Sequence, residues 1–428
     1  MPVSANIQVV ANSEAIRITE YLKDSGYAYT KCPLASIVNE TSVDPSIDII
    51  LLETSNLPPN EVNKALELLS LQSAPILIVG QNPLPAKYHS IPELFCDLEI
   101  QKRIVSLLRL QIMKKELARR SATTRHYSKQ EEETSAPVQQ QDETKIMLIG
   151  KKSELLGEIL LQLDQKSKVH VCQNAELAID DLRSGGFDAL IVIGAGQGDI
   201  NLRLCNDIRA DSRLFNLPVL FVLEHESNRE AAYIHGASDI ILNPDEMQNL
   251  YTRAMLHINQ AEYRFSLQTL FKASKPLPVT DGPTGLYSFG FMMAHLKALM
   301  DDHGSENKYL SIATLNIMNL SEINEEYGYP AGDQVLRQIG NIVSFLVRGE
   351  DFCCRHKNGQ FLIALPCTSK EDARVALNRV YGVTRNTDFS LIGVDQPVSA
   401  VVTMGLAEAN KGDSIDEIIK RGRENPFK

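Results

Sequence analysis

The chain has 428 residues, of which 43% are hydrophobic and 23% charged, and its formal net charge is −11. This length is enough for two to four domains, each with a core of its own. The acidic balance argues against broad binding to nucleic acids or anionic membranes, which attract basic surfaces, but it leaves room for a small anion held by a local arginine cluster. The longest apolar runs are of strand length and the first residues lack a signal-peptide pattern, so we expect a cytoplasmic protein without membrane insertion.

Two changes in composition divide the chain. Residues 121–143 are rich in Ser, Thr, Gln and Glu, which predicts a flexible linker. Residues 272–283 contain three prolines and a glycine, which predicts a hinge. The expected domains are therefore residues 1–120, 144–271 and 284–428, and the last is expected to end early, since Pro426 interrupts its final helix.

The first two domains repeat one plan of apolar runs. The runs at 7–10, 48–52 and 75–79 in the first domain correspond to those at 146–149, 188–192 and 218–222 in the second. Continuous apolar strands that alternate with amphipathic helices predict a parallel sheet covered on both faces, a doubly wound α/β domain. Each repeat is expected to end in a long helix, at 98–120 and at 246–271.

The third domain follows another order. A strand at 309–317 precedes a helix at 320–346, a hairpin at 352–366, a helix at 370–383 and a strand at 399–407. Mixed strands and helices around a central hairpin predict an α+β sandwich.

The two repeats resemble response-regulator receiver domains, which have the flavodoxin-like fold, and residues 236–239 resemble the Gly-Ala-x-Asp before the last receiver strand. Receivers hold Mg²⁺ with an acidic pair and take phosphate on an aspartate. The second repeat has Gly150 and Lys151 at the acidic pair, and the first has Glu53 at the degenerate phosphoacceptor position. Glu53 either imitates a phosphorylated state or reflects drift in a disused site. We expect both repeats to dock proteins, including a second copy of this chain, without phosphorylation.

The third domain resembles the GGDEF domain of diguanylate cyclases, and the resemblance begins at residues 281–287. The five-residue signature falls on 357–361, where only Phe361 is kept. The metal-binding carboxylates of that family would fall on Asn316 and Gly359, neither of them acidic. The resemblance therefore implies a degenerate GGDEF domain that is not an enzyme and holds no metal. Asn324 and Asp333 keep the guanine-contacting residue types. Either they persist for structural reasons, or they retain residual binding of GTP.

An Arg-x-x-Asp pattern, Arg348 to Asp351, lies six positions before the signature, where the family carries its inhibitory cyclic di-GMP site. Arg379 stands on the next helix, where the family supplies another contact. Arginine can fork to a phosphate or to a guanine edge, and aspartate can accept from guanine N–H groups. The alternative is an ordinary exposed ion pair, worth only ~0–1 kcal/mol. The same pattern at Arg385 to Asp388 has no counterpart in the family.

The whole arrangement resembles PleD/PopA-type response regulators, which implies bacterial two-component or cell-cycle signalling. We expect a non-catalytic effector that binds cyclic di-GMP as its ligand, needs no cofactor and docks proteins through the receiver-like domains. Two alternatives stay open: a pure scaffold that binds no nucleotide, and a weak diguanylate cyclase.

Overall fold

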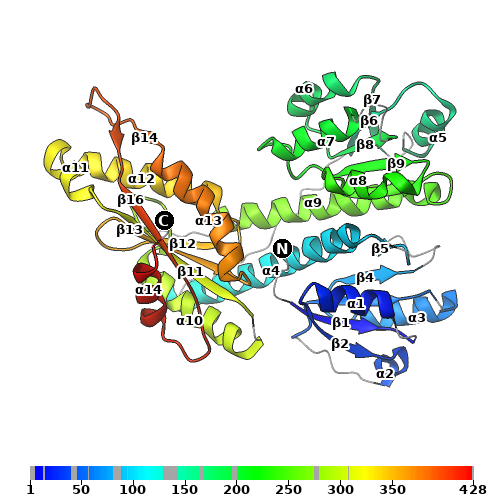
Figure 1. Cartoon of the computed structure of the whole chain (residues 1–428), viewed down its shortest axis with the longest axis horizontal. Coiled ribbons are helices and arrows are strands. Elements are labelled where there is room, and N and C mark those ends of the chain that lie inside the picture. The colour runs from blue at the N-terminus through cyan, green and yellow to red at the C-terminus, as the bar shows by residue number, and fades with distance from the viewer. Residues whose placement is uncertain are drawn as a thin grey trace.

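The structure of the chain, a computed structural model, has three parts (Figure 1). It describes residues 5–12, 15–39, 46–55, 57–80, 88–93, 95–128, 143–163, 167–194, 200–273, 279–306 and 308–426. Two units with parallel sheets lie on one side and a unit with an antiparallel sheet lies on the other.

The first unit is built on a parallel sheet of strand order β2-β1-β3-β4-β5. Its elements are β1 Asn6–Val10, α1 Ile16–Asp24, β2 Ala28–Cys32, α2 Leu34–Asn39, β3 Ile49–Glu53, α3 Pro59–Leu69, β4 Ile76–Val79, β5 His89–Ile91 and α4 Asp97–Ser128. Alternate residues of β3 enter different cores: Ile49 and Leu51 pack with α1 and α4, whereas Ile50 and Leu52 pack with α3. Both faces are therefore covered, which is why β3 is apolar without alternation.

The second unit repeats this sheet with the order β7-β6-β8-β9-β10. Its elements are β6 Lys145–Ile149, α5 Glu154–Leu163, β7 Lys168–Cys172, α6 Ala175–Gly185, β8 Ala189–Ile193, α7 Ile200–Ala210, β9 Val219–Leu223, η1 Glu226–Asn228, α8 Arg229–Ile234, β10 Asp239–Leu242, η2 Met247–Asn249 and α9 Leu250–Ala273. The prediction of two α/β units with parallel sheets is confirmed.

The third unit is built on an antiparallel sheet of order β12-β13-β11-β16. Its elements are α10 Phe289–Glu306, β11 Leu310–Ile317, α11 Leu320–Tyr327, α12 Tyr329–Leu346, β12 Phe352–Arg355, β13 Gln360–Pro366, α13 Lys370–Arg385, β14 Asp388–Phe389, β15 Val398–Ser399, β16 Val402–Glu408 and α14 Ile415–Glu424. The α+β prediction is confirmed. The helix expected at 320–346 is divided, because Gly328 takes a positive φ of 84° between α11 and α12.

Both predicted connections overlap with helices. Helix α4 continues to Ser128, into the segment expected to be a linker, and residues 129–142 lie outside the described residues. Thr124 is buried on this helix, so tertiary packing extends α4 despite the polar composition. In the expected hinge, α9 reaches Ala273, Val279 is buried and Thr280 pairs with Tyr287, while 274–278 lie outside the described residues.

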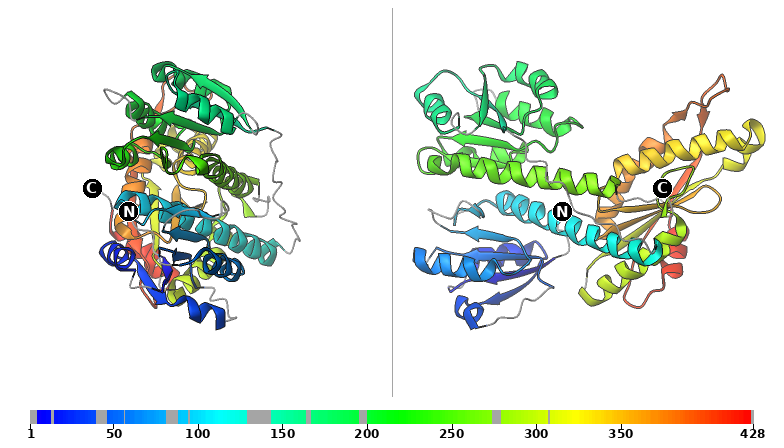
Figure 2. Two further views of the ribbon diagram at one scale, coloured as in Figure 1. Left: turned by 90° about the vertical axis from the view of Figure 1, so that its right-hand side faces the viewer. Right: turned by 180° about the vertical axis from the view of Figure 1, so that it is seen from behind.

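Helices α4 and α9 pack against each other and extend from the two α/β units towards the third unit (Figures 1 and 2). On α4, Glu116 accepts a hydrogen bond of 2.7 Å from Arg120 and lies 2.8 Å from Nε2 of His295 on α10. Arg120 also donates to the carbonyl groups of Glu350 and Asp351, at 2.9 and 3.0 Å. Helix α4 of the first unit is thus built into the third unit.

Two lysines form a second connection between the first and third units. Asp48, just before β3, accepts hydrogen bonds of 3.0 Å from Lys115 on α4 and from Lys308 just before β11. Among the described residues, no helix is long and apolar enough to cross a membrane.

We expect Glu116→Gln to destabilise the protein by about 3–5 kcal/mol, because Arg120 would keep a buried charge without a carboxylate. Burial alone would raise the pKa of Glu116, but His295 and Arg120 lower it to about 2. This pKa is below the ordinary value of 4.5, so the stabilisation is present at neutral pH and is lost as the pH falls from about 4.5 towards 2. Thermal unfolding at pH 7 measures the effect.

The matched control is Asp302→Asn. It removes a partly exposed carboxylate of α10 that pairs with Arg119, which lies on α4 as Glu116 does. This change should cost only ~0–1 kcal/mol. Equal melting temperatures for the two variants would contradict a structural role for Glu116.

Candidate functional site

The loop between α12 and β12 places Arg348 and Asp351. The backbone N–H of Arg348 donates to Oδ2 of Asp351 at 2.8 Å, and the N–H of Asp351 donates back to the carbonyl of Arg348 at 3.2 Å. Asp351 is only 6% exposed, and its Oδ1 is buried without a hydrogen-bond partner among the described residues. A buried carboxylate oxygen without a donor is costly unless a ligand supplies one.

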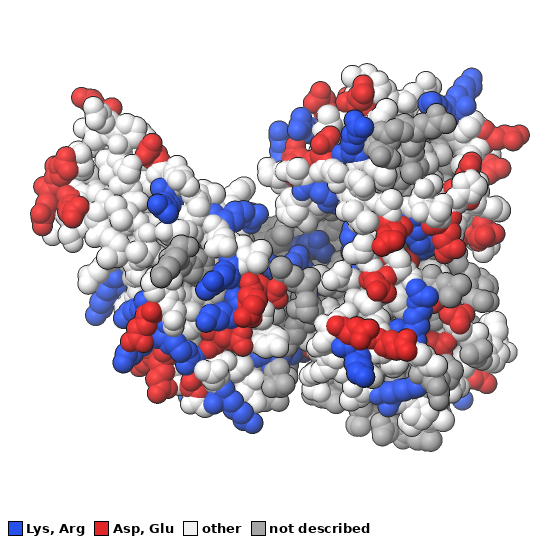
Figure 3. Space-filling view, viewed as in Figure 1, with Lys and Arg blue, Asp and Glu red and all other residues white. Residues whose placement is uncertain are grey.

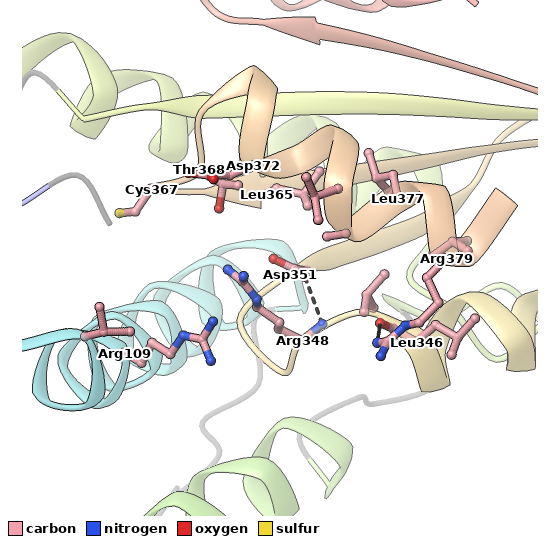
Figure 4. A pocket seen from close by; sticks show the side chains of 15 residues that line it. Arg109, Leu346, Arg348, Asp351, Leu365, Cys367, Thr368, Asp372, Leu377 and Arg379 are labelled. Carbon is pink, nitrogen blue, oxygen red and sulfur yellow. Dashed lines mark hydrogen bonds between the residues drawn. The ribbon is translucent and has the colours of Figure 1, made fainter. Parts of the chain in front are cut away.

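A cavity of about 440 Å³ brings the predicted residues together (Figure 4). Arg348, Asp351 and Arg379 all line it, so the structure groups the three residues that the sequence predicted. Arg379 comes from α13, is exposed and donates to the carbonyl of Leu346 at 2.7 Å. The three predicted residues therefore lie together around one cavity.

Arg109 of α4 lines the same cavity, and sequence reasoning missed it. Its Nε is buried and has no hydrogen-bond partner among the described residues. No local motif surrounds Arg109, and only the packing of α4 beside the Arg348 loop brings it to the site.

A larger cavity of about 620 Å³ adjoins the first and shares Arg109, Arg348, Asp351 and Arg379 with it. Arg120 of α4 and Arg264 of α9 also line this cavity. Figure 3 shows Lys and Arg side chains at the floor of the hollow between the third unit and the second. This part of an acidic protein is locally cationic, as an anionic ligand requires.

The electrostatics of the site are set by burial. Burial, with repulsion from the Glu350 carboxylate, raises the pKa of Asp351 to about 7. Burial also lowers the pKa of Arg109, and the neighbouring Arg348 adds repulsion. Both shifts indicate charges that lack full solvation or pairing in the protein alone.

We expect Asp351→Asn to stabilise the protein at pH 8 by on the order of 1–3 kcal/mol, because the amide removes an incompletely paired buried charge and can still accept from the Arg348 N–H. The folded pKa of Asp351 is above its ordinary 3.8, so the stability of the parent protein should fall as the pH rises from about 4 to about 7. The advantage of the variant should shrink towards pH 5, where the parent carboxyl is protonated. Melting temperatures measured at several pH values test this, and a variant that is less stable at pH 8 would refute it.

The hairpin position of the third unit carries amides. Asn316 and Gln360 face each other across β11 and β13, and Gln360 Nε2 donates to Asn316 Oδ1 at 2.7 Å. Arg423 of α14 donates to Gln360 Oε1, and Nδ1 of His356 lies 2.8 Å from the same oxygen. Sequence reasoning missed Arg423.

These groups do not fit a divalent metal ion. Gly359 has a φ of +73°, a left-handed conformation that favours glycine, and a Cβ there would lie 2.9 Å from Leu320 Cδ2. Over the described ranges, no group of three or more His, Cys, Asp and Glu side chains could hold a metal ion. Amide oxygens bind Mg²⁺ more weakly than carboxylates do.

The predicted guanine contacts, Asn324 and Asp333, lie on α11 and α12. A Cβ at Gly332 would be 1.9 Å from Asn324 Oδ1, so glycine permits the Asn324 amide to lie against α12 next to Asp333. Asp333 is exposed. The structure thus brings the two positions close together. Neither residue lines the two cavities beside the Arg348 loop.

Two further positions fall elsewhere. Glu53 ends β3, is 7% exposed, and its Oε1 accepts from the Ser55 N–H at 3.1 Å. The second Arg-x-x-Asp pattern lies apart from the cavities: Arg385 stacks over Tyr381, and Asp388 accepts from Ser399 at 2.7 Å. Arg385 is therefore a suitable control position.

Residues 279–425 match the family model described as Diguanylate cyclase, GGDEF domain. Response regulator PleD of Caulobacter vibrioides (strain NA1000 / CB15N) is 26% identical over 246 residues, which cover 57% of this chain and 54% of PleD. Diguanylate cyclase DgcP of Pseudomonas aeruginosa is 27% identical over 143 residues, covering 33% of this chain and 21% of DgcP. The chain thus contains a GGDEF domain and is similar to PleD, although it spans only about half of PleD's length.

A solved structure, the GGDEF domain of DgcB from Caulobacter crescentus in complex with c-di-GMP, is 19% identical. The match covers 34% of this chain and 84% of the DgcB chain, at a TM-score of 0.33.

The prediction that the chain is not an enzyme is contradicted by these comparisons. The matching family is that of diguanylate cyclases, and relatives including DgcP and Diguanylate cyclase A of Treponema denticola carry that name. The prediction rested on a few changed side chains, whereas the match extends over residues 279–425, and nothing in the comparisons marks this domain as degenerate.

Proposed function

We propose that the chain is a PleD-like signalling protein that binds cyclic di-GMP at the cavity of Arg348, Asp351 and Arg379. The observation that carries this proposal is the buried, unpartnered Oδ1 of Asp351 at the edge of a space lined by arginines. Cyclic di-GMP offers two phosphates to the guanidinium groups and guanine N–H donors to the carboxylate. Because Arg109 belongs to α4, the bound ligand would contact the first unit as well as the GGDEF domain.

We also propose that the two α/β units act as receiver-like docking domains in the cytoplasm. Their strand order is that of the flavodoxin-like fold, to which receivers belong. They would bind protein partners, including a second copy of the chain, while Glu53 either supplies a fixed negative charge or has no role.

We expect Arg348→Ala to weaken cyclic di-GMP binding roughly ten- to hundredfold, the usual effect of losing one charged, forked contact. Arg109→Ala should weaken it through the same loss of charge. Asp351→Ala should narrow the preference for cyclic di-GMP over cyclic di-AMP, because adenine has neither the N1–H nor the N2–H₂ donor that guanine offers to the carboxylate. Isothermal titration of the full chain, freed of bound nucleotide, measures all three.

Arg385→Ala is the matched control, since it removes an arginine from an Arg-x-x-Asp pattern outside the cavities. It should leave binding unchanged. Equal effects of Arg348→Ala and Arg385→Ala, or no binding by the parent protein, would favour a scaffold that binds no nucleotide.

We expect the affinity for cyclic di-GMP to fall about tenfold between pH 8 and pH 6. The guanine edge needs ionised Asp351, whose pKa is raised to about 7, so binding below this pH first requires loss of a proton. Titrations in matched ionic strength test this. The affinity of Asp351→Asn should depend little on pH. A parent affinity that does not change with pH would show that Asp351 does not contact the ligand.

The names of the relatives favour a second candidate function, diguanylate cyclase activity. Incubation of the nucleotide-free chain with GTP and either Mg²⁺ or Mn²⁺ tests it. Formation of cyclic di-GMP above a control without protein would assign this activity, whatever the outcome of the titrations.

A further inference from the structure

A cavity of about 480 Å³ lies between the two α/β units, enclosed by α4, α9 and the end of the second sheet. We propose that it binds a small molecule with one or two phosphate groups. The lining includes Lys102, Arg103, Arg109, Arg209 and Arg264, and no Asp or Glu is among the described residues that line it. The proposal is separate from cyclic di-GMP binding at Arg348, Asp351 and Arg379, which do not line this cavity, although Arg109 lines both cavities.

Three cations of this cavity, Arg209, Lys102 and Arg264, have uncharged hydrogen-bond partners, whereas Arg103 pairs with Asp239. Arg209 donates to the carbonyl groups of Gly236, Phe215 and Leu217 at 2.8 to 2.9 Å. Lys102 donates to the carbonyl groups of Tyr233 and Ala237.

Arg264 donates to the side chains of Asn216 and Ser106, at 3.3 and 3.2 Å. These contacts fix the position of each cation but do not neutralise its charge.

Three donors of the cavity lining have no partner among the described residues: Nε of Arg103, Nε of Arg109 and Nε2 of Gln260. Arg103 is 4% exposed and directs its terminal nitrogens to Asp239 and His257, while its buried Nε is unpaired. The amide nitrogen Nε2 of Gln260 is also buried and unpaired. Unpaired buried donors beside a space indicate a ligand that accepts hydrogen bonds.

Electrostatics point to the same ligand. Burial lowers the pKa of Lys102 to about 8 and lowers the pKa of Arg109, Arg209 and Arg264. Several partly desolvated cations around one space repel each other, and an anion among them would remove that cost.

A phosphate group suits this arrangement because its oxygens accept several N–H donors at once and match the arginine fork. The volume is within the range of small-molecule sites and exceeds that of a lone phosphate. Phe215, also on the lining, is 49% exposed and offers a ring face to an attached base. A ligand here would contact α4 of the first unit and α9 of the second together.

The test is isothermal titration of the full chain with inorganic pyrophosphate, and with GDP in a parallel series. We expect pyrophosphate to bind and to raise the melting temperature beyond NaCl of equal ionic strength. Lys102→Met should weaken binding roughly tenfold or more, the effect of losing one charged contact. Gln260→Leu, which changes no charge, should weaken it less and serves as a second variant if Lys102→Met does not fold.

Arg348→Ala is the control for the neighbouring cavities and should bind pyrophosphate like the parent. Tighter binding of GDP than of pyrophosphate, lost in Phe215→Ala, would identify a nucleotide as the ligand class, and equal binding would identify a simple diphosphate. The proposal is overturned if the parent does not bind, if NaCl gives the same thermal shift, or if Arg348→Ala abolishes binding while the Lys102 and Gln260 variants keep it.

Discussion

The burial of Glu116 between Arg120 and His295 is the contact that fixes the first unit against the GGDEF domain. A carboxylate with no solvent exposure is tolerated only where cations and donors surround it, and α4 and α10 together supply them. Because Glu116 and Arg120 belong to a helix that begins in the first unit, that unit cannot turn freely against the GGDEF domain. The same arginine holds the carbonyl groups of Glu350 and Asp351, so the ion pair and the candidate ligand loop form one structure.

A second buried network holds the two α/β units together. Arg229 of α8 donates to Glu99 of α4 at 2.9 and 3.0 Å, and Asp239 of β10 pairs with Arg103 and Arg253. In this network cations and carboxylates alternate, whereas Lys102, Arg209 and Arg264, which line the adjacent cavity of about 480 Å³, have uncharged hydrogen-bond partners. An anion would therefore be stabilised more by the cations of the cavity than at the charged interface, where carboxylates already neutralise the cations.

The sequence predicted the elements with strong local signals. Continuous apolar runs indicated buried parallel strands, and the order of helices and strands indicated the α+β unit. The Arg348 to Asp351 pattern located the loop that the structure places on a cavity. Arg109, Arg264 and Arg423 could not be predicted, because each reaches its site only through packing between elements far apart in the chain. The extension of α4 was missed for a related reason: residues 121–128 are polar by composition, yet Thr124 is buried and Oγ1 of Thr123 lies 3.2 Å from Nδ1 of His295 in the third unit.

Side-chain chemistry at single positions was a poorer guide to activity. Asn316 accepts a hydrogen bond from Gln360 at a position where the resemblance to the family implies a metal-binding carboxylate, and the prediction that the chain is not an enzyme extended this local change to the whole chain. The comparisons over residues 279–425 contradict that step. The changed side chains indicate which ligands this site can bind, whereas the cyclase activity is decided by incubation with GTP.

Because of the path of α4, the residues that match the family model differ from the residues that pack together in the third unit. The stacked rings of Tyr287 and Phe352 lie beneath the Arg120 guanidinium, and His295 is sealed by Glu116. A fragment that began at residue 279 would contain every residue that the family model matches and would still lack the helix that covers this aromatic surface. An aromatic surface of this GGDEF domain is therefore covered by a helix of the first unit, a segment that leaves the ribosome long before the domain itself is synthesised.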